Sequence, residues 1–186
     1  MDSEAAGTDD LVLLETGPTD STWSSLLTTF RWLQFATTTA PFKAAHYIAK
    51  MNDDAYVVVP ELARQLRRLR ESPHTSSTAN VYTGVFHWTS YRPKSFTHAG
   101  SSDDLSTAQK ASCLQDGTCQ GSFPFATSSM QLLSRTLAHA LVTSSSAAAH
   151  IERIKALLGQ PREEPAYEDV WMGYALSFLA ASREVR

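Results

Sequence analysis

Two adjacent carboxylates, Asp53 and Asp54, follow Asn52 directly after an apolar, strand-like run at residues 46–51. Oxygen ligands on rigid supports suit a Mg2+ or Mn2+ ion, because such ions prefer oxygen and share phosphate oxygens with a substrate. The alternative is an Asx-turn, in which Asn52 and Asp53 only hydrogen-bond to their own backbone. Taken alone, these three residues leave both interpretations open.

A second acidic pair, Glu168 and Asp169, stands at the start of the last predicted helix, residues 167–181. Carboxylates in a first helical turn are stabilised by the helix dipole, so capping is one sufficient explanation. A carboxylate fixed at a helix end can also serve as a general base for an acceptor hydroxyl. The pair is therefore a candidate catalytic site as well as a candidate cap.

The elements that must position these pairs follow from hydrophobic periodicity and from turn residues. Residues 52–54 are predicted to form a corner between two of the strands. Alternation of strands with helices predicts an α/β layered domain. The predicted strands are residues 11–14, 46–51, 55–58, 80–88 and 125–133, and the predicted helices are residues 20–36, 60–70, 147–158 and 167–181, with one more capped by Ser134.

The chain of 186 residues, 42% of them hydrophobic, is long enough to bury one substantial core. We expect a single domain over residues 11–182, preceded by a disordered tail at residues 1–10. Residues 89–122 contain many Ser, Thr, Gly and Pro residues and are too long for a simple connection. They are predicted to be a long loop, either disordered or functional.

Lys and Arg total 16 against 19 Asp and Glu, a net charge of -3, which argues against a nucleic-acid partner. Four arginines nevertheless gather in residues 64–70, as a solvated helix face or as a phosphate-binding patch. The sequence has no apolar stretch of 18 residues, and its acidic N-terminus lacks the cationic region of a signal peptide. We therefore expect no membrane anchor or targeting segment in this sequence.

Cys113 and Cys119 are the two cysteines, separated by a glycine-containing loop. They could form a disulfide in an oxidising compartment or remain two thiols. Their spacing is not that of a zinc-ligand pair, and the sequence contains no second pair of cysteines. A structural zinc site is not expected, and the sequence does not indicate the oligomeric state.

The order of these motifs resembles that of the β-1,3-glycosyltransferases of glycosyltransferase family 31. Residues 50–57, Lys-Met-Asn-Asp-Asp-Ala-Tyr-Val, resemble the family's Lys-x-Asp-Asp-Asp-x-Phe-Val strand and corner. Residues 168–173, Glu-Asp-Val-Trp-Met-Gly, are similar to its Glu-Asp-Val-x-x-Gly signature near the acceptor site. Residues 81–84 and 132–135 match further segments in the same order. The phosphoglycan β-1,3-galactosyltransferase type is the most similar.

The resemblance implies a GT-A fold, with a Rossmann-like sheet that binds a UDP-sugar. It implies a Mn2+ or Mg2+ ion held by Asp54, with Asn52 offering its carbonyl oxygen. Asp53, Lys50 and Asn52 would lie at the donor. Asp169 would deprotonate the acceptor hydroxyl, with Glu168 as its neighbour and helix cap.

The implied activity is inverting hexosyl transfer, β-1,3-galactosyl transfer to a glycan acceptor being favoured. Members of the family work in the Golgi lumen as membrane-associated proteins, so an anchor would have to come from outside this sequence. The chain also resembles a family member shortened at both ends.

Three departures from the family pattern keep other functions open. Asn52 replaces an aspartate, residues 128–131 (Ser-Ser-Met-Gln) stand where relatives have consecutive glycines, and the ends of the family domain are missing. One alternative is a truncated or degenerate, catalytically inactive homologue. Another is a non-enzymatic α/β interaction domain whose acidic pairs are only turns and caps. Convergence of Asp54 and Asp169 on one cleft would favour the transferase.

Overall fold

The 15-residue strand β4 (Gln120–Ser134) lies between β1 (Tyr47–Met51) and β2 (Tyr82–Arg92), and β3 (Thr97–Ser101) pairs with the other edge of β2. All these pairs are antiparallel, giving a four-stranded sheet of order β1-β4-β2-β3. The computed structural model describes residue 14 and residues 24–72, 80–92, 97–101, 120–156 and 167–182. Because β1 and β2 both run antiparallel to β4, they are parallel to each other.

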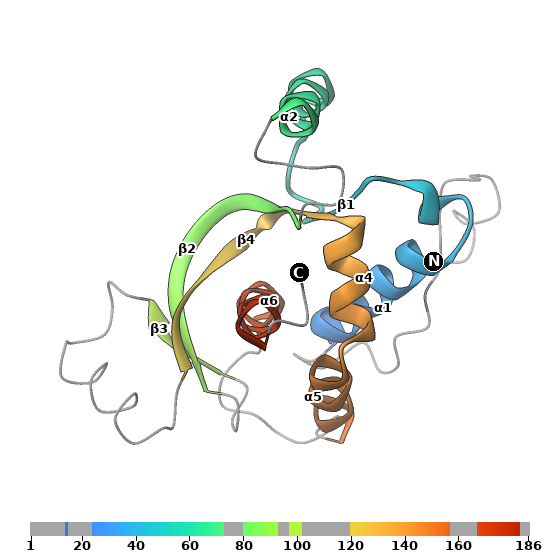
Figure 1. Cartoon of the computed structure of the whole chain (residues 1–186). Coiled ribbons are helices and arrows are strands. Elements are labelled where there is room, and N and C mark those ends of the chain that lie inside the picture. Colours follow the sequence, from blue (N-terminus) through green and yellow to red (C-terminus); the bar gives the residue numbers. More distant parts are fainter. Residues whose placement is uncertain are drawn as a thin grey trace.

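The predicted α/β class is confirmed at this level, because helices and a sheet form one mixed structure (Figure 1). The Rossmann-like form of that sheet stays a prediction. The described helices are α1 (Ser24–Thr38), α2 (Val59–Glu71), α4 (Arg135–Thr143), α5 (Ser145–Lys155) and α6 (Glu168–Ser182), with a 3-10 turn at Phe42–Ala44. Three predictions fall outside the described residues: the tail at residues 1–10, the strand at residues 11–14 except for its last residue, and the state of the two cysteines.

The core lies on one side of the sheet, where α6 sits within the curve of β2 and β4 and α1 and α4 pack beside it (Figure 1). Trp171 of α6 is buried and meets Phe30 of α1 edge to face, with ring centroids 6.1 Å apart. α1 is tied to the sheet through Trp32, whose indole N–H donates to the carbonyl oxygen of Ala49 at 3.4 Å. These contacts fix α1 and α6 against β1 and β4.

Serine caps define two consecutive helices, as the sequence predicts for the first of them. The Oγ atom of Ser134 accepts hydrogen bonds from the backbone N–H groups of Leu137 and Val81, so it caps α4 and joins the end of β4 to the start of β2. Ser144 accepts from the N–H of Ala147 and starts α5 in the same way. Each cap satisfies a backbone donor that has no partner within its helix.

Two predictions about the strands are wrong. Residues 55–58 form no strand: Tyr56 is 90% exposed, and the carbonyl oxygen of Val58 already accepts the first backbone bonds of α2. The loop predicted at residues 89–122 begins and ends in strands, because Thr89 pairs with Phe123 and Tyr91 with Gln120. Ser- and Thr-rich segments give a weak strand signal, and here cross-strand pairing decides the conformation.

Gly173 allows α6 to approach β4 closely. A Cβ atom at this position would lie 2.8 Å from the Cα of Phe125 and 2.8 Å from the carbonyl oxygen of Pro124. Both are backbone atoms of β4, so they cannot move aside as a flexible side chain would. The glycine that closes the Glu-Asp-Val-x-x-Gly motif therefore has a packing role, in which the helix backbone rests directly on the strand.

We expect Gly173→Ala to lower the free energy of unfolding by about 1 to 3 kcal/mol, because overpacking against β4 outweighs the roughly 1 kcal/mol gain in helix propensity. Chemical denaturation would measure the change. Ser177→Ala, a half-buried position in the same helix, should change stability by less than about 0.5 kcal/mol. Equal or greater stability of Gly173→Ala would contradict the close approach.

Candidate functional site

An ion pair joins the two acidic motifs, which are 118 positions apart in the sequence. The ammonium group of Lys50, on β1, donates to a carboxylate oxygen of Glu168, the first residue of α6. Both side chains are largely withdrawn from water, at 18% and 15% exposure. The structure thus brings the strand before the acidic corner next to the start of α6.

Ser128 of β4 lies between the two motifs and contacts both. Its Oγ atom accepts a hydrogen bond of 3.4 Å from the side-chain amide of Asn52. Its backbone also lies near the carboxyl group of Asp169 and lowers the pKa of that group. Ser128 stands where the family pattern has a glycine, and in this chain its hydroxyl and its backbone connect the predicted metal motif to the predicted base.

Asp169 is partly buried beside this serine, and burial raises the pKa of its carboxyl group above the usual value. The charge of Glu168 raises this pKa further, while the N–H of Val170, which donates to Oδ1 at 2.8 Å, the ammonium of Lys50 and the backbone of Ser128 lower it. Desolvation is the largest of these effects. Asp169 is therefore a better proton acceptor than an exposed aspartate.

Tyr82 of β2 completes this side of the site. Its hydroxyl oxygen accepts the backbone N–H of Ala126 at 2.9 Å, and the ring packs against the core. Burial raises the pKa of the phenol, and the nearby charge of Asp169 adds to this rise. The phenol stays protonated at neutral pH and retains a proton that it can donate.

The acidic corner itself is a tight turn, closed by a hydrogen bond of 3.2 Å from the N–H of Ala55 to the carbonyl oxygen of Asn52. Asp53 and Asp54 are exposed, and neither carboxylate has an ion pair or hydrogen bond within the described part of the chain. Asn52 does not bond only locally, since its amide reaches Ser128. The corner is thus a turn whose two carboxylates point into solvent.

The donor set fits a metal only in part. Two adjacent carboxylates suit an ion that keeps most of its water and shares phosphate oxygens. However, no group of three or more His, Cys, Asp or Glu side chains that could hold an ion occurs among the described residues. Nor does any hydrogen bond join Asp54 to Asp169 there. Lys50 pairs with Glu168 at the start of α6 and Asn52 bonds to Ser128 of β4, whereas Asp53 and Asp54 have no hydrogen bond or ion pair to α6 among the described residues.

Sequence reasoning found the two motifs but missed the residues that link them. Ser128 looked like a departure from the family pattern, and Tyr82 was only part of a matching strand. Their roles depend on the register of β4, in which Met130 pairs with Met51 and Leu133 with both Ile48 and Tyr82. A short serine-rich segment gives no local signal for that register.

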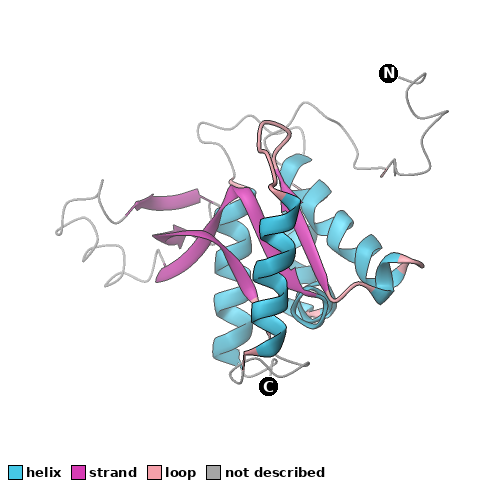
Figure 2. Ribbon diagram, turned by 90° about the horizontal axis from the view of Figure 1, so that it is seen from above, coloured by secondary structure: helices cyan, strands magenta, loops and turns pink. Residues whose placement is uncertain are grey.

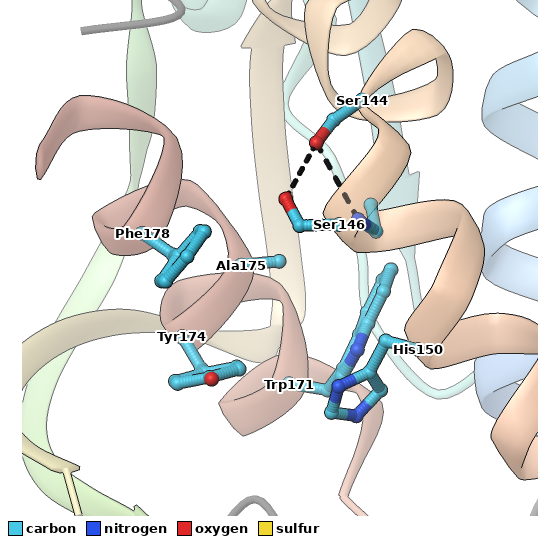
Figure 3. A pocket seen from close by; sticks show the side chains of 8 residues that line it. Ser144, Ser146, His150, Trp171, Tyr174, Ala175 and Phe178 are labelled. Atoms are coloured by element: carbon cyan, nitrogen blue, oxygen red, sulfur yellow. Dashed lines mark hydrogen bonds between the residues drawn. The ribbon is translucent and has the colours of Figure 1, made fainter. Parts of the chain in front are cut away.

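A second cluster of polar side chains lies between α5 and α6, where Ser144, Ser146 and His150 face Trp171 and Tyr174 (Figure 3). Burial lowers the pKa of His150 to about 4, so its imidazole is neutral at neutral pH. The indole N–H of the buried Trp171 has no acceptor among the described residues. The cavity here measures only about 60 Å³, room for a few water molecules but not for a sugar nucleotide.

Comparison with known proteins assigns no family. No protein-family model matches the chain, no curated protein is detectably similar, and no solved structure matches it. The resemblance to glycosyltransferase family 31 therefore rests on the motifs in the sequence and stays a prediction.

We expect a double-mutant cycle to measure the coupling between β1 and α6. Lys50→Met and Glu168→Gln should each lower the free energy of unfolding by about 1 to 3 kcal/mol, because each leaves a partly buried charge unpaired. The double variant should lose less than the sum of the two single losses.

The exposed pair of Arg64 and Glu61 on α2 provides the matched control. Its cycle, with Arg64→Met and Glu61→Gln, should give a coupling below about 0.5 kcal/mol. If the effects of Lys50→Met and Glu168→Gln on the free energy of unfolding were strictly additive, the ion pair would not couple β1 to α6.

Asp169→Asn should become more stable relative to the parent as the pH rises from about 4 to 7. The raised pKa means that the folded protein holds this proton more tightly than the unfolded chain. That contribution is present below the unfolded pKa and is lost as the pH rises through the folded pKa, whereas asparagine does not titrate. Urea denaturation at several pH values would measure it, and a difference independent of pH would contradict a buried, ionising Asp169.

Proposed function

We propose that this chain is a UDP-sugar-dependent inverting hexosyltransferase of the family 31 type, transferring β-1,3-galactosyl groups to a glycan acceptor. The observation that carries the proposal is the junction of two motifs far apart in sequence. Lys50 is paired to Glu168, and Ser128, which accepts a hydrogen bond from Asn52, lowers the pKa of Asp169 through its backbone. If the two motifs were an independent turn and an independent cap, Lys50 and Asn52 would have no reason to make these long-range contacts.

Asp169 is assigned the role of general base. Its carboxylate accepts the proton of the acceptor hydroxyl, so that the oxygen attacks the anomeric carbon as the bond to the UDP oxygen breaks. The raised pKa of Asp169 favours this proton transfer, and Lys50 holds Glu168 so that a second carboxylate stays beside the base as a paired charge. The protonated phenol of Tyr82 lies close enough for its own pKa to respond to Asp169.

Asp54 and Asn52 are assigned to a Mn2+ or Mg2+ ion, and Asp53 and Lys50 to the donor. When bound, the ion supplies positive charge to the diphosphate leaving group. The exposed carboxylates of Asp53 and Asp54 are accessible to such a complex from solvent. Asn52 contributes a neutral oxygen where an aspartate would add charge, and its amide nitrogen is held by Ser128.

The GT-A fold and a place in the Golgi lumen, membrane-associated through a segment outside this sequence, belong to the same proposal. Support for the fold comes from the position of the acidic corner, which directly follows β1 at the edge of a sheet packed against helices. None of the helices in the described ranges is long and apolar enough to cross a membrane.

An inactive homologue is the second candidate, and two observations favour it. Asp53 and Asp54 do not gather with Glu168 and Asp169 into one group of metal ligands among the described residues. In addition, Asn52 and Ser128 satisfy each other by a hydrogen bond at the position where the transferase needs contacts to its donor. Such a protein would keep the contacts between the two motifs but would not bind a UDP-sugar.

Calorimetric titration of UDP, with and without Mn2+, separates the two candidates. An active site predicts Mn2+-dependent UDP binding that Asp54→Ala abolishes and that Asp169→Asn leaves nearly unchanged, because the base contacts the acceptor and not the diphosphate. Glu152→Ala, which removes an exposed carboxylate on α5, is the matched control and should bind as the parent does.

Binding of UDP would then be followed by transfer assays with UDP-galactose, in which Asp169→Asn should lose at least about 100-fold in rate. Absence of UDP binding under every condition would overturn the transferase proposal and leave the inactive homologue.

A further inference from the structure

Helix α2 is strongly amphipathic but buries none of its residues. Its leucines at positions 62, 66 and 69 follow helical spacing and form one apolar stripe, yet all three remain only half-buried. The helix lies on the side of the sheet opposite α6 (Figure 1), and seen from above it crosses in front of the strands (Figure 2). An amphipathic helix normally buries such a stripe, so this face of α2 is incompletely covered.

A groove of about 540 Å³ separates α2 from the sheet. Its floor belongs to β2 and β4, where Val85 is 63% exposed while Leu132 is buried. The volume lies within the range of small-molecule sites and is about nine times that of the cavity beside His150. The lining residues are Leu62, Gln65, Leu66, Arg68, Leu69, Thr83, Gly84, Val85, Ser129, Met130 and Leu132.

The rim of this groove is positively charged although the whole chain is acidic. α2 contains four arginines and two glutamates, a net charge of +2, within a chain of net charge -3. Glu61 is already engaged by Arg64, whose Nε donates to it at 2.8 Å, and by Gln65. Arg68 lines the groove and has no salt bridge among the described residues. An apolar cavity with a cation at its edge is complementary to a ligand that has a hydrocarbon body and an anionic group at one end.

We propose that this groove binds a single-chain anionic amphiphile, with its hydrocarbon body between the three leucines and the sheet and its anionic group at Arg68. Burial of the hydrocarbon covers the leucine stripe and Val85 together, which supplies most of the affinity. The guanidinium adds a charge-assisted hydrogen bond to a carboxylate, sulfate or phosphate group. This site is independent of the proposed transferase chemistry.

The size of the groove favours such a ligand over a peptide. Stable protein partners cover about 800 Å² on each side, whereas this groove is a wedge between two turns of helix and two strands. The apolar lining likewise disfavours a sugar or nucleotide, whose hydroxyl and phosphate groups would lose their hydration without partners.

Titration calorimetry with decanoate, below the concentration at which it forms micelles, tests the proposal on the full chain. N-decanoyl-N-methylglucamide has the same hydrocarbon chain and a neutral head, so it reports the contribution of charge. We expect decanoate to bind at one site more tightly than the neutral amphiphile, with an affinity that falls as salt is added.

Three variants locate the site. Leu66→Gln should weaken decanoate binding at least tenfold, because it breaks the apolar lining. Arg68→Gln should weaken decanoate binding about two- to fivefold and leave the neutral amphiphile unaffected. Arg67→Gln makes the same change of charge on the same helix outside the groove and should have a smaller effect than Arg68→Gln. Because α2 contributes no buried residue, all three variants should keep the circular dichroism spectrum of the parent.

Four results would overturn the proposal. Absence of decanoate binding would show that the groove takes no amphiphile. Equal binding by the parent and Leu66→Gln would place the ligand elsewhere. Equal effects of Arg67→Gln and Arg68→Gln, or equal affinity for both amphiphiles, would reject Arg68 as the partner of the anionic group.

Discussion

The contact of α6 with β4 at Gly173 is the constraint on which the rest of the arrangement depends. The helix backbone lies so close to Phe125 and Pro124 that a single methyl group would collide with the strand. This approach sets the height of α6 above the sheet. It places Trp171 in the core against Phe30 and brings Glu168 and Asp169, one to two turns earlier, within reach of β1 and β4.

This placement of α6 withdraws the carboxylates of Glu168 and Asp169 from water. Partly buried carboxylates are unfavourable unless they are paired or hydrogen-bonded. The chain offsets this cost with Lys50 at Glu168 and with the N–H group of Val170 at Asp169, and the nearby backbone of Ser128 also lowers the pKa of Asp169. The offset is incomplete at Asp169, whose pKa stays raised, and an incompletely compensated charge is a common property of residues that exchange protons.

Local patterns predicted those parts of the fold that depend on neighbouring residues. The Ser134 cap, a strand predicted at residues 46–51 and the turn at the acidic corner follow from periodicity and turn chemistry. The structure contains all three, with the strand at Tyr47–Met51. The strand predicted at residues 55–58 is wrong, because an apolar run forms a strand only where another strand pairs with it. The Asn52–Ser128 and Lys50–Glu168 contacts span 76 and 118 positions, so they depend on strand register and helix docking that no local pattern encodes.

The central position of β4 also bears on the order in which the parts of the protein fold. Its pairing with β2 joins segments nearer in sequence than its pairing with β1, where Tyr47 meets Ser134, and closing the longer loop costs more chain entropy. The candidate site needs β1, β4 and α6 together, so it belongs to the late stage of folding. In the folded protein, a local fluctuation that moves α6 away from the sheet separates Glu168 and Asp169 from β1 and β4, even while the strands stay hydrogen-bonded to each other.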